Sequence, residues 1–372
     1  MRKSEESRTI AALSASRERV VVVGAGLAGL AVAARLRAAG REVLVLEASA
    51  RAGGQVHTWR EGALTVELGA EGFVARSRAV PALCARLGLE GELVDQLTTD
   101  TYAVEPSGLV LLPPGEAARR LGFQVPAEEL GRGIRSLRLG MGQLTDALTA
   151  SLEPGQLRLQ SSVVGLSGGP GQLLLELEGG TTESATHVVV ASPARRAAAL
   201  LGPQEGAALA DAPLMSNVSV NLLYQRDQLR LYPAGSGLVF PERFGSVGLR
   251  ALSLVEHKFS GRVAPGQSLI RVFFRPVADA LSVWEDHRFA SEATLAIAQV
   301  LGAEGAPART WVSRWADALP VFSPAYREQA AAADRALQAR GVHVTGSAFH
   351  GAGLDAAVRS AEVVAARLGA AH

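Results

Sequence analysis

The chain has little of several residue types on which other protein classes depend. Its 372 residues include one cysteine, Cys84, and two lysines, Lys3 and Lys258. A single thiol excludes an internal disulfide and a cysteine pair as metal ligands, and this usage is typical of a reducing compartment. Aromatic residues make up only 5% of the chain.

Excess charge and long apolar runs are missing as well. The 37 Lys and Arg residues balance 36 Asp and Glu residues, giving a net charge of +1. This balance excludes a general nucleic-acid binder, which needs a basic surplus. No apolar run approaches the length of about twenty residues that a membrane-spanning helix needs. Residues 1–20 lack a secretory signal segment, so we expect a cytoplasmic protein with a loose N-terminal tail.

The length favours roughly two domains, and the order of apolar runs predicts how the first begins. Residues 19–23 form an apolar run typical of a buried strand, and the glycine-rich stretch 24–29 follows it. An Ala- and Leu-rich helix is expected next, ended by Gly40. A second apolar strand over 42–46 completes a βαβ unit. The crossover should be right-handed.

Later segments predict more helices and strands, with alternation typical of an antiparallel sheet from 218 to 274. Residues 113–135, rich in proline and glycine, are predicted to be a connection. The other expected strands and helices are a hairpin over 102–112, strands at 64–68, 157–160, 172–177, 188–191, 311–315 and 342–345, and helices at 80–87, 143–152, 289–301 and 354–368. We therefore predict an α/β fold, α+β overall: a Rossmann-like domain with a second, largely antiparallel domain.

The glycine-rich turn predicts a dinucleotide site. Gly24 permits the turn, Gly26 allows a pyrophosphate to approach, and Gly29 allows close packing of helix on strand. The helix N-terminus, at Leu27 and Ala28, favours an anion. Glu47, at the end of the next strand, is placed to bond ribose hydroxyls. Glycine is abundant in this chain, with 40 residues, so the alternative is an ordinary tight turn with a solvated glutamate.

The residues after that strand favour FAD over NAD. The pattern Glu47-Ala48, Arg51, Gly53-Gly54-Gln55 and Thr58 resembles the second dinucleotide motif of the FAD-dependent amine oxidase superfamily. The paired glycines let backbone amides approach the phosphates, and Arg51 can add charge-assisted bonds. The superfamily usually has Arg or Lys where Gln55 stands, so a neutral contact replaces an ionic one.

A C-terminal segment, residues 344–354, also resembles this superfamily. There a glycine-rich turn, here at Gly346, and the following helix close over the flavin. The resemblance implies that Gly353 and Leu354 face the flavin C2 carbonyl and N1, where negative charge collects on reduction. Ser347 stands where an acidic residue or Asn is usual. An ordinary glycine-capped strand is the alternative interpretation.

Further segments narrow the resemblance to bacterial protoporphyrinogen and coproporphyrinogen oxidases. They are 66–76, 87–89, 139–144, 189–194 and 314–320. The resemblance, which extends in order from about residue 19 to 368, implies that Gly69, Ala70, Glu71 and Trp315 lie near the flavin ring. It also implies that the backbone of Val163 contacts adenine. Cys84 lies away from the position where some amine oxidases bond flavin covalently, so FAD should be non-covalent.

The implied chemistry is stepwise hydride removal from coproporphyrinogen III or protoporphyrinogen IX to the flavin, with oxygen as acceptor. The setting would be haem biosynthesis, with another enzyme of that pathway as a possible partner. Such chemistry needs orientation more than an acid/base pair, so no catalytic residue is assigned. His57, His257, His287 and His350 lack the spacing of metal ligands, and no metal is expected.

One departure concerns the connection, since in the family a long helical insertion covers the substrate and often contacts the membrane. Residues 113–138 are all that fill this place, so we expect a more open pocket and at most peripheral membrane contact. Thr101 stands where some relatives have a basic residue that holds a propionate. Arg132, Arg135 and Arg138 are candidates to replace it, or else form a solvated basic face.

We predict an FAD-binding domain built from residues 19–76, 139–200 and 311–372. A substrate-side segment would cover 77–138, and the antiparallel substrate domain 201–310. One alternative function is a flavin amine oxidase or carotenoid-type desaturase, although four Tyr and four Trp leave little for an aromatic amine cage. Another is a non-catalytic flavin- or porphyrin-binding protein, which the departures at Gln55, Ser347 and Thr101 would fit.

Overall fold

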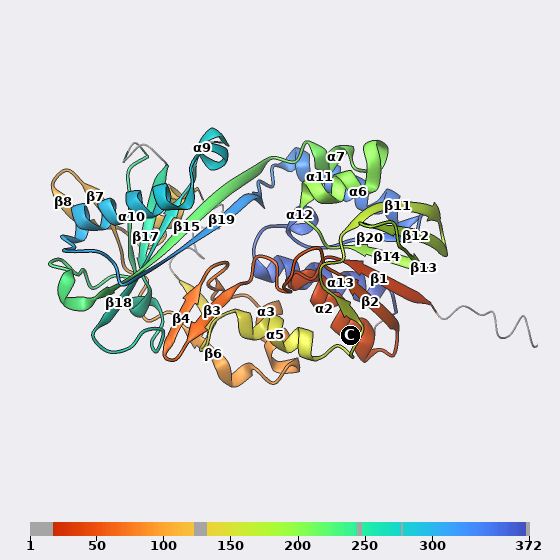
Figure 1. Ribbon diagram of the computed structural model, residues 1–372, viewed down its shortest axis with the longest axis horizontal. Helices are drawn as coiled ribbons and strands as arrows, with labels where there is room; N and C mark the ends of the chain where they lie inside the picture. The colour runs from red at the N-terminus through yellow and green to blue at the C-terminus, as the bar shows by residue number, and fades with distance from the viewer. Residues whose placement is uncertain (1–17, 123–131, 243, 245–247, 277, 370–372) are drawn as a thin grey trace, which may run out of the picture.

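Two sheets of different character lie toward opposite ends of the molecule (Figure 1). The structure, a computed structural model, describes residues 18–122, 132–242, 244, 248–276 and 278–369. The expected N-terminal tail and part of the short connection lie outside these residues. One sheet is parallel and the other is mostly antiparallel, so the predicted fold class is confirmed.

The parallel sheet begins with the predicted βαβ unit. Its strands, in spatial order, are β10 (Leu157–Arg158), β2 (Glu42–Leu46), β1 (Arg19–Val23), β14 (His187–Val190) and β20 (Val342–Val344). Val21 of the central strand pairs with Leu44 on one side and Val188 on the other. These strands are apolar on both faces because helices cover both faces.

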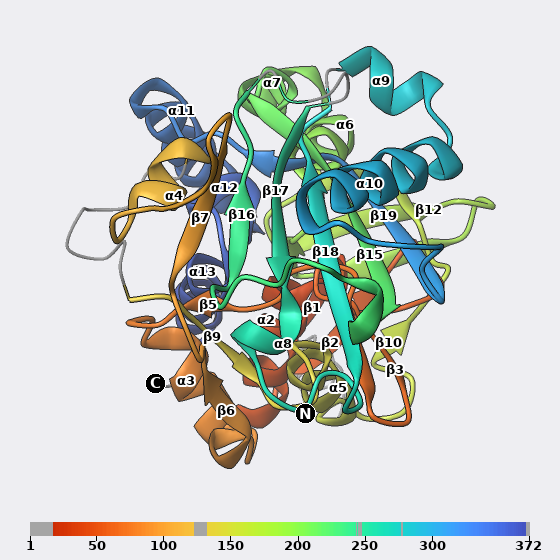
Figure 2. The same cartoon turned by 90° about the vertical axis from the view of Figure 1, so that its left-hand side faces the viewer.

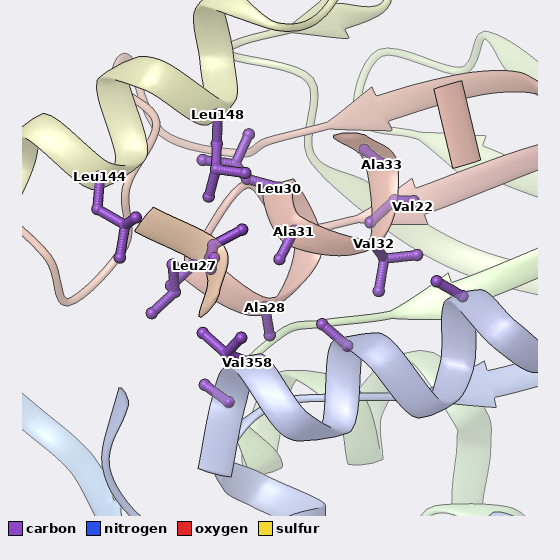
Figure 3. Packing of buried hydrophobic residues seen from close by; sticks show 14 of the residues in the cluster. Val22, Leu27, Ala28, Leu30, Ala31, Val32, Ala33, Leu144, Leu148 and Val358 are labelled. Atoms are coloured by element: carbon purple, nitrogen blue, oxygen red, sulfur yellow. The ribbon is translucent and has the colours of Figure 1, made fainter. Parts of the chain in front are cut away.

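One face of this sheet is covered by α2 (Leu27–Ala38), α13 (Leu354–Arg367), α5 (Gly142–Ala150) and α3 (Ala79–Arg86). The other is covered by α6 (Ala194–Glu205), α7 (Ala207–Ala210), α11 (Pro324–Gln338) and α12 (Ser347–His350). Leu144 and Leu148 of α5 and Val358 of α13 surround α2 (Figure 3). Such a helix is apolar nearly all round because neighbours cover all its sides.

The second sheet includes the predicted hairpin, which extends it at one edge. Its strands, in spatial order, are β19 (Arg309–Pro320), β15 (Leu214–Gln225), β18 (Gln267–Phe274), β17 (Leu249–Leu254), β16 (Gly237–Val239), β7 (Thr101–Glu105) and β8 (Gly108–Leu111). Neighbouring strands are antiparallel except β16 and β7. Figure 2 shows these strands side by side, with α9 (Ala278–Val283) and α10 (Asp286–Leu301) near one edge.

The two faces of this sheet differ in polarity because side chains alternate along a strand. Val220, Ile270 and Val272 pack with α10 in an apolar core. The opposite face carries Asn221 and Arg271, which stand directly across from each other on β15 and β18. This face contacts the segment that follows β4 (Leu64–Glu67).

The remaining sheets are small. They are the β4 hairpin with β3 (Thr58–Glu61), a sheet of β5 (Phe73–Val74), β9 (Ile134–Leu137) and β6 (Leu93–Asp95), and a sheet of β11 (Val163–Gly169), β12 (Gln172–Leu177) and β13 (Thr182–Ala185). The shorter helices are α4 (Glu116–Arg120), α8 (Val255–Lys258), η1 (Glu90–Glu92) and η3 (Arg226–Gln228). The connection predicted over 113–135 is wrong in its last two residues, because β9 starts at Ile134 and pairs with two distant strands.

One predicted domain boundary falls inside a single element, because β19 runs from Arg309 to Pro320, across the boundary at 311. The boundary at 200 lies close to Gly202, where α6 is interrupted by non-helical backbone. The division into domains stays a prediction. Among the residues that the structure describes, no helix has both the length and the apolar character to cross a membrane.

Candidate flavin site

The glycine-rich turn at the end of β1 leaves its backbone open at one point. A Cβ atom on Gly29 would lie 2.0 Å from the carbonyl oxygen of Gly24, so helix and turn pack with no room for a side chain. Gly24 has a positive φ of 107°. A Cβ atom on Gly26 would meet nothing within 4 Å. The turn is therefore closed on the protein side and open at Gly26.

The start of α2 has the character of an anion site. Gly26 is its N-cap, no side chain caps it, and its first turn holds no acidic residue. The first amides of a helix have no intrahelical acceptor, so Leu27 and Ala28 present N–H groups at the positive end of the helix dipole. These donors fit a phosphate group.

Glu47 holds the turn through both carboxylate oxygens. Its Oε2 accepts a hydrogen bond from Ala25 N at 2.7 Å, and its Oε1 accepts from Ser49 N at 2.9 Å. Oε1 also accepts from Ser49 Oγ at 2.6 Å, so Oε2 is the oxygen with a lone pair left for a hydroxyl donor. Ser161 N donates to Glu47 O at 2.8 Å. Val163, the first residue of β11, follows Ser161 by two positions in the sequence. Ala48 is exposed.

The second predicted motif lies directly on the first turn. Gly53 N donates to Ala25 O at 2.8 Å, and a Cβ atom on Gly54 would come within 3.0 Å of Gly26 Cα. The Arg51 guanidinium donates to the carbonyls of Gly54 at 2.6 Å and Ala52 at 3.0 Å. It thus holds the loop in shape. Partial burial lowers the pKa of Arg51, although Glu47 opposes this change.

Gln55 bonds another part of the protein. Its Nε2 donates to Ala318 O of β19 at 2.9 Å, so the amide links the second motif to the large sheet. The side chain that is predicted to contact the cofactor thus bonds the backbone of β19.

The third predicted segment, residues 346–354, also lies beside the glycine-rich turn. A Cβ atom on Gly346, which has a positive φ of 95°, would lie 3.5 Å from Ala28 Cβ at the start of α2. Gly346 N donates to the buried Ser360 Oγ at 3.0 Å. Ser347 begins α12, and Leu354 begins α13 next to Gly353, whose Cβ position borders open space. The structure therefore brings all three predicted segments to one edge of the parallel sheet.

The predicted flavin-ring segment packs on the second motif. A Cβ atom on Gly69 would lie 1.9 Å from Gln55 O, and Ala70 N donates to the same oxygen at 2.9 Å. Trp315 Nε1 of β19 donates to Leu68 O at 3.0 Å. Gly69 and Ala70 are thus neighbours of the second motif, and Trp315 bonds the residue before them; their place near a flavin ring stays a prediction.

A buried ion pair lies behind this segment. Glu67 and Arg262 are 7% and 1% exposed, and Arg262 Nη1 lies 3.2 Å from Glu67 Oε1. Arg262 also donates to Ser136 Oγ at 2.9 Å and to Leu137 O at 2.7 Å. Burial raises the pKa of Glu67, although Arg262 and the N–H of Met141 oppose this change.

Glu71 is held by two cations from the large sheet and its connections. Lys258 Nζ bonds its Oε1, and Arg271 Nη1 lies 3.6 Å from its Oε2. Burial alone would raise the pKa of Glu71, but Lys258 and Arg271 outweigh it and leave the pKa lowered. Burial lowers the pKa of Arg271. Glu71 thus joins the predicted flavin segment to the cations of the large sheet.

Sequence reasoning missed Lys258, Arg262, Arg271 and Asn221. One signal was present: Arg271 is the one charged residue in the otherwise apolar stretch 269–274. The rarity of lysine was another. Neither signal predicts which residue these side chains bond, because the partners are far away in the sequence. Lys258 and Glu71, for example, are about 190 positions apart.

Other predicted candidates have ordinary partners. Arg135 pairs with Asp95 at 2.8 Å and Arg138 with Glu92 at 3.7 Å, while Arg132 is exposed. His350, which precedes the C-terminal glycine turn, has its Nε2 3.2 Å from Val344 O. Within the described part of the chain, no group of three or more His, Cys, Asp or Glu side chains is placed to hold a metal ion.

Comparisons with known proteins identify the family of the chain. The profile of the flavin containing amine oxidoreductase family matches residues 27–121 and 104–369. A coproporphyrinogen III oxidase from Propionibacterium freudenreichii is 34% identical over 248 residues, 64% of this chain but only 46% of that protein. One from Bacillus subtilis is 24% identical and covers 92% of this chain and 96% of its own length.

Solved structures show the same fold. A protein from Exiguobacterium sp. 255-15, assigned provisionally as a protoporphyrinogen oxidase, superimposes with a TM-score of 0.82 at 22% identity, over 95% of this chain and 99% of its own. A putrescine oxidase superimposes with a TM-score of 0.73 at 16% identity, over 94% and 98%. The resemblance predicted from the sequence is confirmed. The chain belongs to the family of flavin-containing amine oxidoreductases, and it is a flavin-dependent oxidoreductase.

Proposed function

We propose that the chain oxidises a porphyrinogen to the porphyrin in haem biosynthesis, with non-covalent FAD as hydride acceptor and oxygen as final acceptor. The substrate would be coproporphyrinogen III or protoporphyrinogen IX. The observation that carries the proposal is the extent of likeness to coproporphyrinogen III oxidases. Relatives of this name from Bacillus subtilis and Mycobacterium leprae each match over 96% of their own length and more than 90% of this chain.

The residues at the edge of the parallel sheet fit FAD. The amides at the start of α2 and the backbone of Gly53 and Gly54 would hold the phosphates, and Glu47 a ribose. Gly353 and Leu354, at the N-terminus of α13, would favour negative charge on the flavin ring. Bound FAD would supply the hydride acceptor, these residues would orient it, and the large sheet would position the porphyrinogen.

Non-covalent binding is supported by the state of the one thiol. Cys84 is buried in α3, and burial raises its pKa to about 11. At neutral pH the group is therefore a thiol, which is a weak nucleophile. A covalent link through cysteine is not expected.

The short connection supports a more open substrate site. The family profile matches in two pieces that overlap at residues 104–121, just at the start of the connection 113–138. We propose that this is where relatives carry additional residues. At most peripheral membrane contact, a cytoplasmic location and a partner enzyme of the haem pathway remain parts of the proposal.

Amine oxidation is the second candidate. A flavin-dependent L-tryptophan oxidase from Lentzea aerocolonigenes is 32% identical, although only over 39% of this chain. The few aromatic side chains weigh against an amine cage. Trp59 and Trp311 pack on each other with centroids 5.2 Å apart, and Trp284 packs on Phe289 at 5.6 Å.

The test is an anaerobic visible spectrum of the purified holoprotein before and after addition of each porphyrinogen. We expect the flavin band to bleach with coproporphyrinogen III or protoporphyrinogen IX and to return when air is admitted. Coproporphyrin III, which is already oxidised, is the matched control ligand and should leave the band unchanged. A flavin band that persists with both porphyrinogens, or bleaches only with an amine, would contradict the proposal.

A further inference from the structure

Three strands of the large sheet each send one side-chain donor to the backbone of residues 67–69. Asn221 Nδ2 of β15 donates to Glu67 O at 3.1 Å. Trp315 Nε1 of β19 donates to Leu68 O at 3.0 Å, and Arg271 Nη2 of β18 donates to Gly69 O at 2.6 Å. Three successive carbonyls are thus bonded by three neighbouring strands. We call these three donors the clamp.

The amides of the same segment are bonded from the opposite side. Leu68 N and Gly69 N donate to His57 O at 2.8 and 3.2 Å, and Ala70 N donates to Gln55 O at 2.9 Å. Ser136 Oγ donates to Glu71 O at 2.7 Å. The segment is therefore fixed from two sides, by the large sheet and by the loop that leads into β3.

One peptide group in the segment is left over. Among the described residues, the carbonyl of Ala70 and the N–H of Glu71 have no protein partner, whereas their neighbours on both sides are bonded. Ala70 and Glu71 are only half-buried. Buried backbone groups are normally paired, and the groups on both sides of this peptide are paired within the protein. The Ala70–Glu71 peptide is therefore free to bond an external partner.

The geometry points to Asn221, Trp315 and Arg271 as positioning residues that hold the Ala70–Glu71 peptide for hydrogen bonding to the flavin ring. This inference rests on the proposed placement of FAD along residues 24–29, 51–55 and 346–354. Besides carrying the substrate face, the large sheet would then also set the affinity for the ring end of the cofactor. The adenine and phosphate end would bind independently of the clamp.

The test compares FAD with ADP, which lacks the flavin ring, by calorimetric titration of the full chain freed of flavin. W315F removes one N–H donor and keeps an aromatic ring, and N221L removes another donor at similar volume. Each should weaken FAD binding by roughly two- to tenfold, the value of one neutral hydrogen bond, and leave ADP binding unchanged. The matched control is W311F, because Trp311 is on the same strand and face but bonds no carbonyl of residues 67–69. It should change neither affinity.

Two outcomes would overturn the inference. Equal weakening of FAD and ADP would mean that the clamp only supports the fold of the cofactor domain. Unchanged FAD affinity in both W315F and N221L would mean that the peptide has no flavin partner. Both are distinct from failure of the proposed reaction, because they concern binding by the oxidised cofactor and need no porphyrinogen.

Discussion

The two large sheets form their parts of the site in different ways. At the parallel sheet, the site is backbone: glycines and helix-start amides in three continuous segments, 24–29, 51–55 and 346–354. At the mostly antiparallel sheet, the site is side chains from distant positions, such as Lys258 and Arg271 around Glu71.

The cause of the difference is which faces the helices cover. Both faces of the parallel sheet are packed with helices, so its strands are apolar and polar chemistry is confined to the loops at strand ends. The large sheet buries one face under α10, and its other face is available for groups such as Asn221 and Arg271. A site made of backbone needs glycine, and a site made of side chains needs long-range charge pairing.

The largest expected effect concerns that charge pairing. R262M would leave Glu67 buried without its cation, and should lower the free energy of unfolding by about 3–5 kcal/mol at pH 8. The loss should be smaller at pH 5, because the carboxyl group, whose pKa burial already raises, is then more easily neutral. Chemical denaturation at the two pH values measures both. The double variant R262M/E67Q is the control and should recover part of the loss. Equal stability of R262M and the natural chain would show that the pair contributes no stability.

The same contrast explains how much could be predicted from the sequence. The βαβ unit, the glycine turn and the hairpin follow from local patterns, because φ preference and apolar periodicity act within a few residues. The convergence of three glycine segments follows from the resemblance. The bonds of Arg51 to its own loop and of Gln55 to β19 do not, since the acceptors are backbone carbonyls placed by the fold.

A buried histidine is the polar exception in the parallel sheet. His343 of β20 is 7% exposed, and neither ring nitrogen has a hydrogen-bond partner among the described residues. Burial is the main cause that lowers the pKa of His343 from 6.5 to about 4, and the charges of His187 and Arg367 lower it further. The charge of Asp334 acts in the opposite direction. Between these pH values, His343 therefore binds a proton in the unfolded chain but stays neutral in the folded chain. Stability should be full above pH 6.5 and fall by roughly 3 kcal/mol as the pH drops toward 4.

Unfolding free energies measured from pH 7.5 to 4.5 test this expectation. Many carboxylates also titrate at the acid end, so the matched variant H343L is needed. Its stability should fall less steeply than that of the natural chain between pH 6.5 and 4.5. Parallel curves for the two proteins would place the acid sensitivity elsewhere.

The smallest expected effect is a difference between alanine substitutions at two glycines of one turn, Gly29 and Gly26. G29A places a Cβ atom 2.0 Å from Gly24 O, so it should destabilise the chain by about 1–3 kcal/mol even without flavin. G26A adds the same atom where nothing lies within 4 Å and where φ is −71°. It should leave the flavin-free chain's unfolding free energy nearly unchanged but weaken FAD binding, because the new methyl group occupies the approach to the phosphates. Denaturation of the flavin-free proteins and FAD titration give both quantities. If G26A instead lost stability and kept its FAD affinity, the open side of the turn would not be the cofactor side, and the contrast between a backbone site and a side-chain site would fail at its best-defined point.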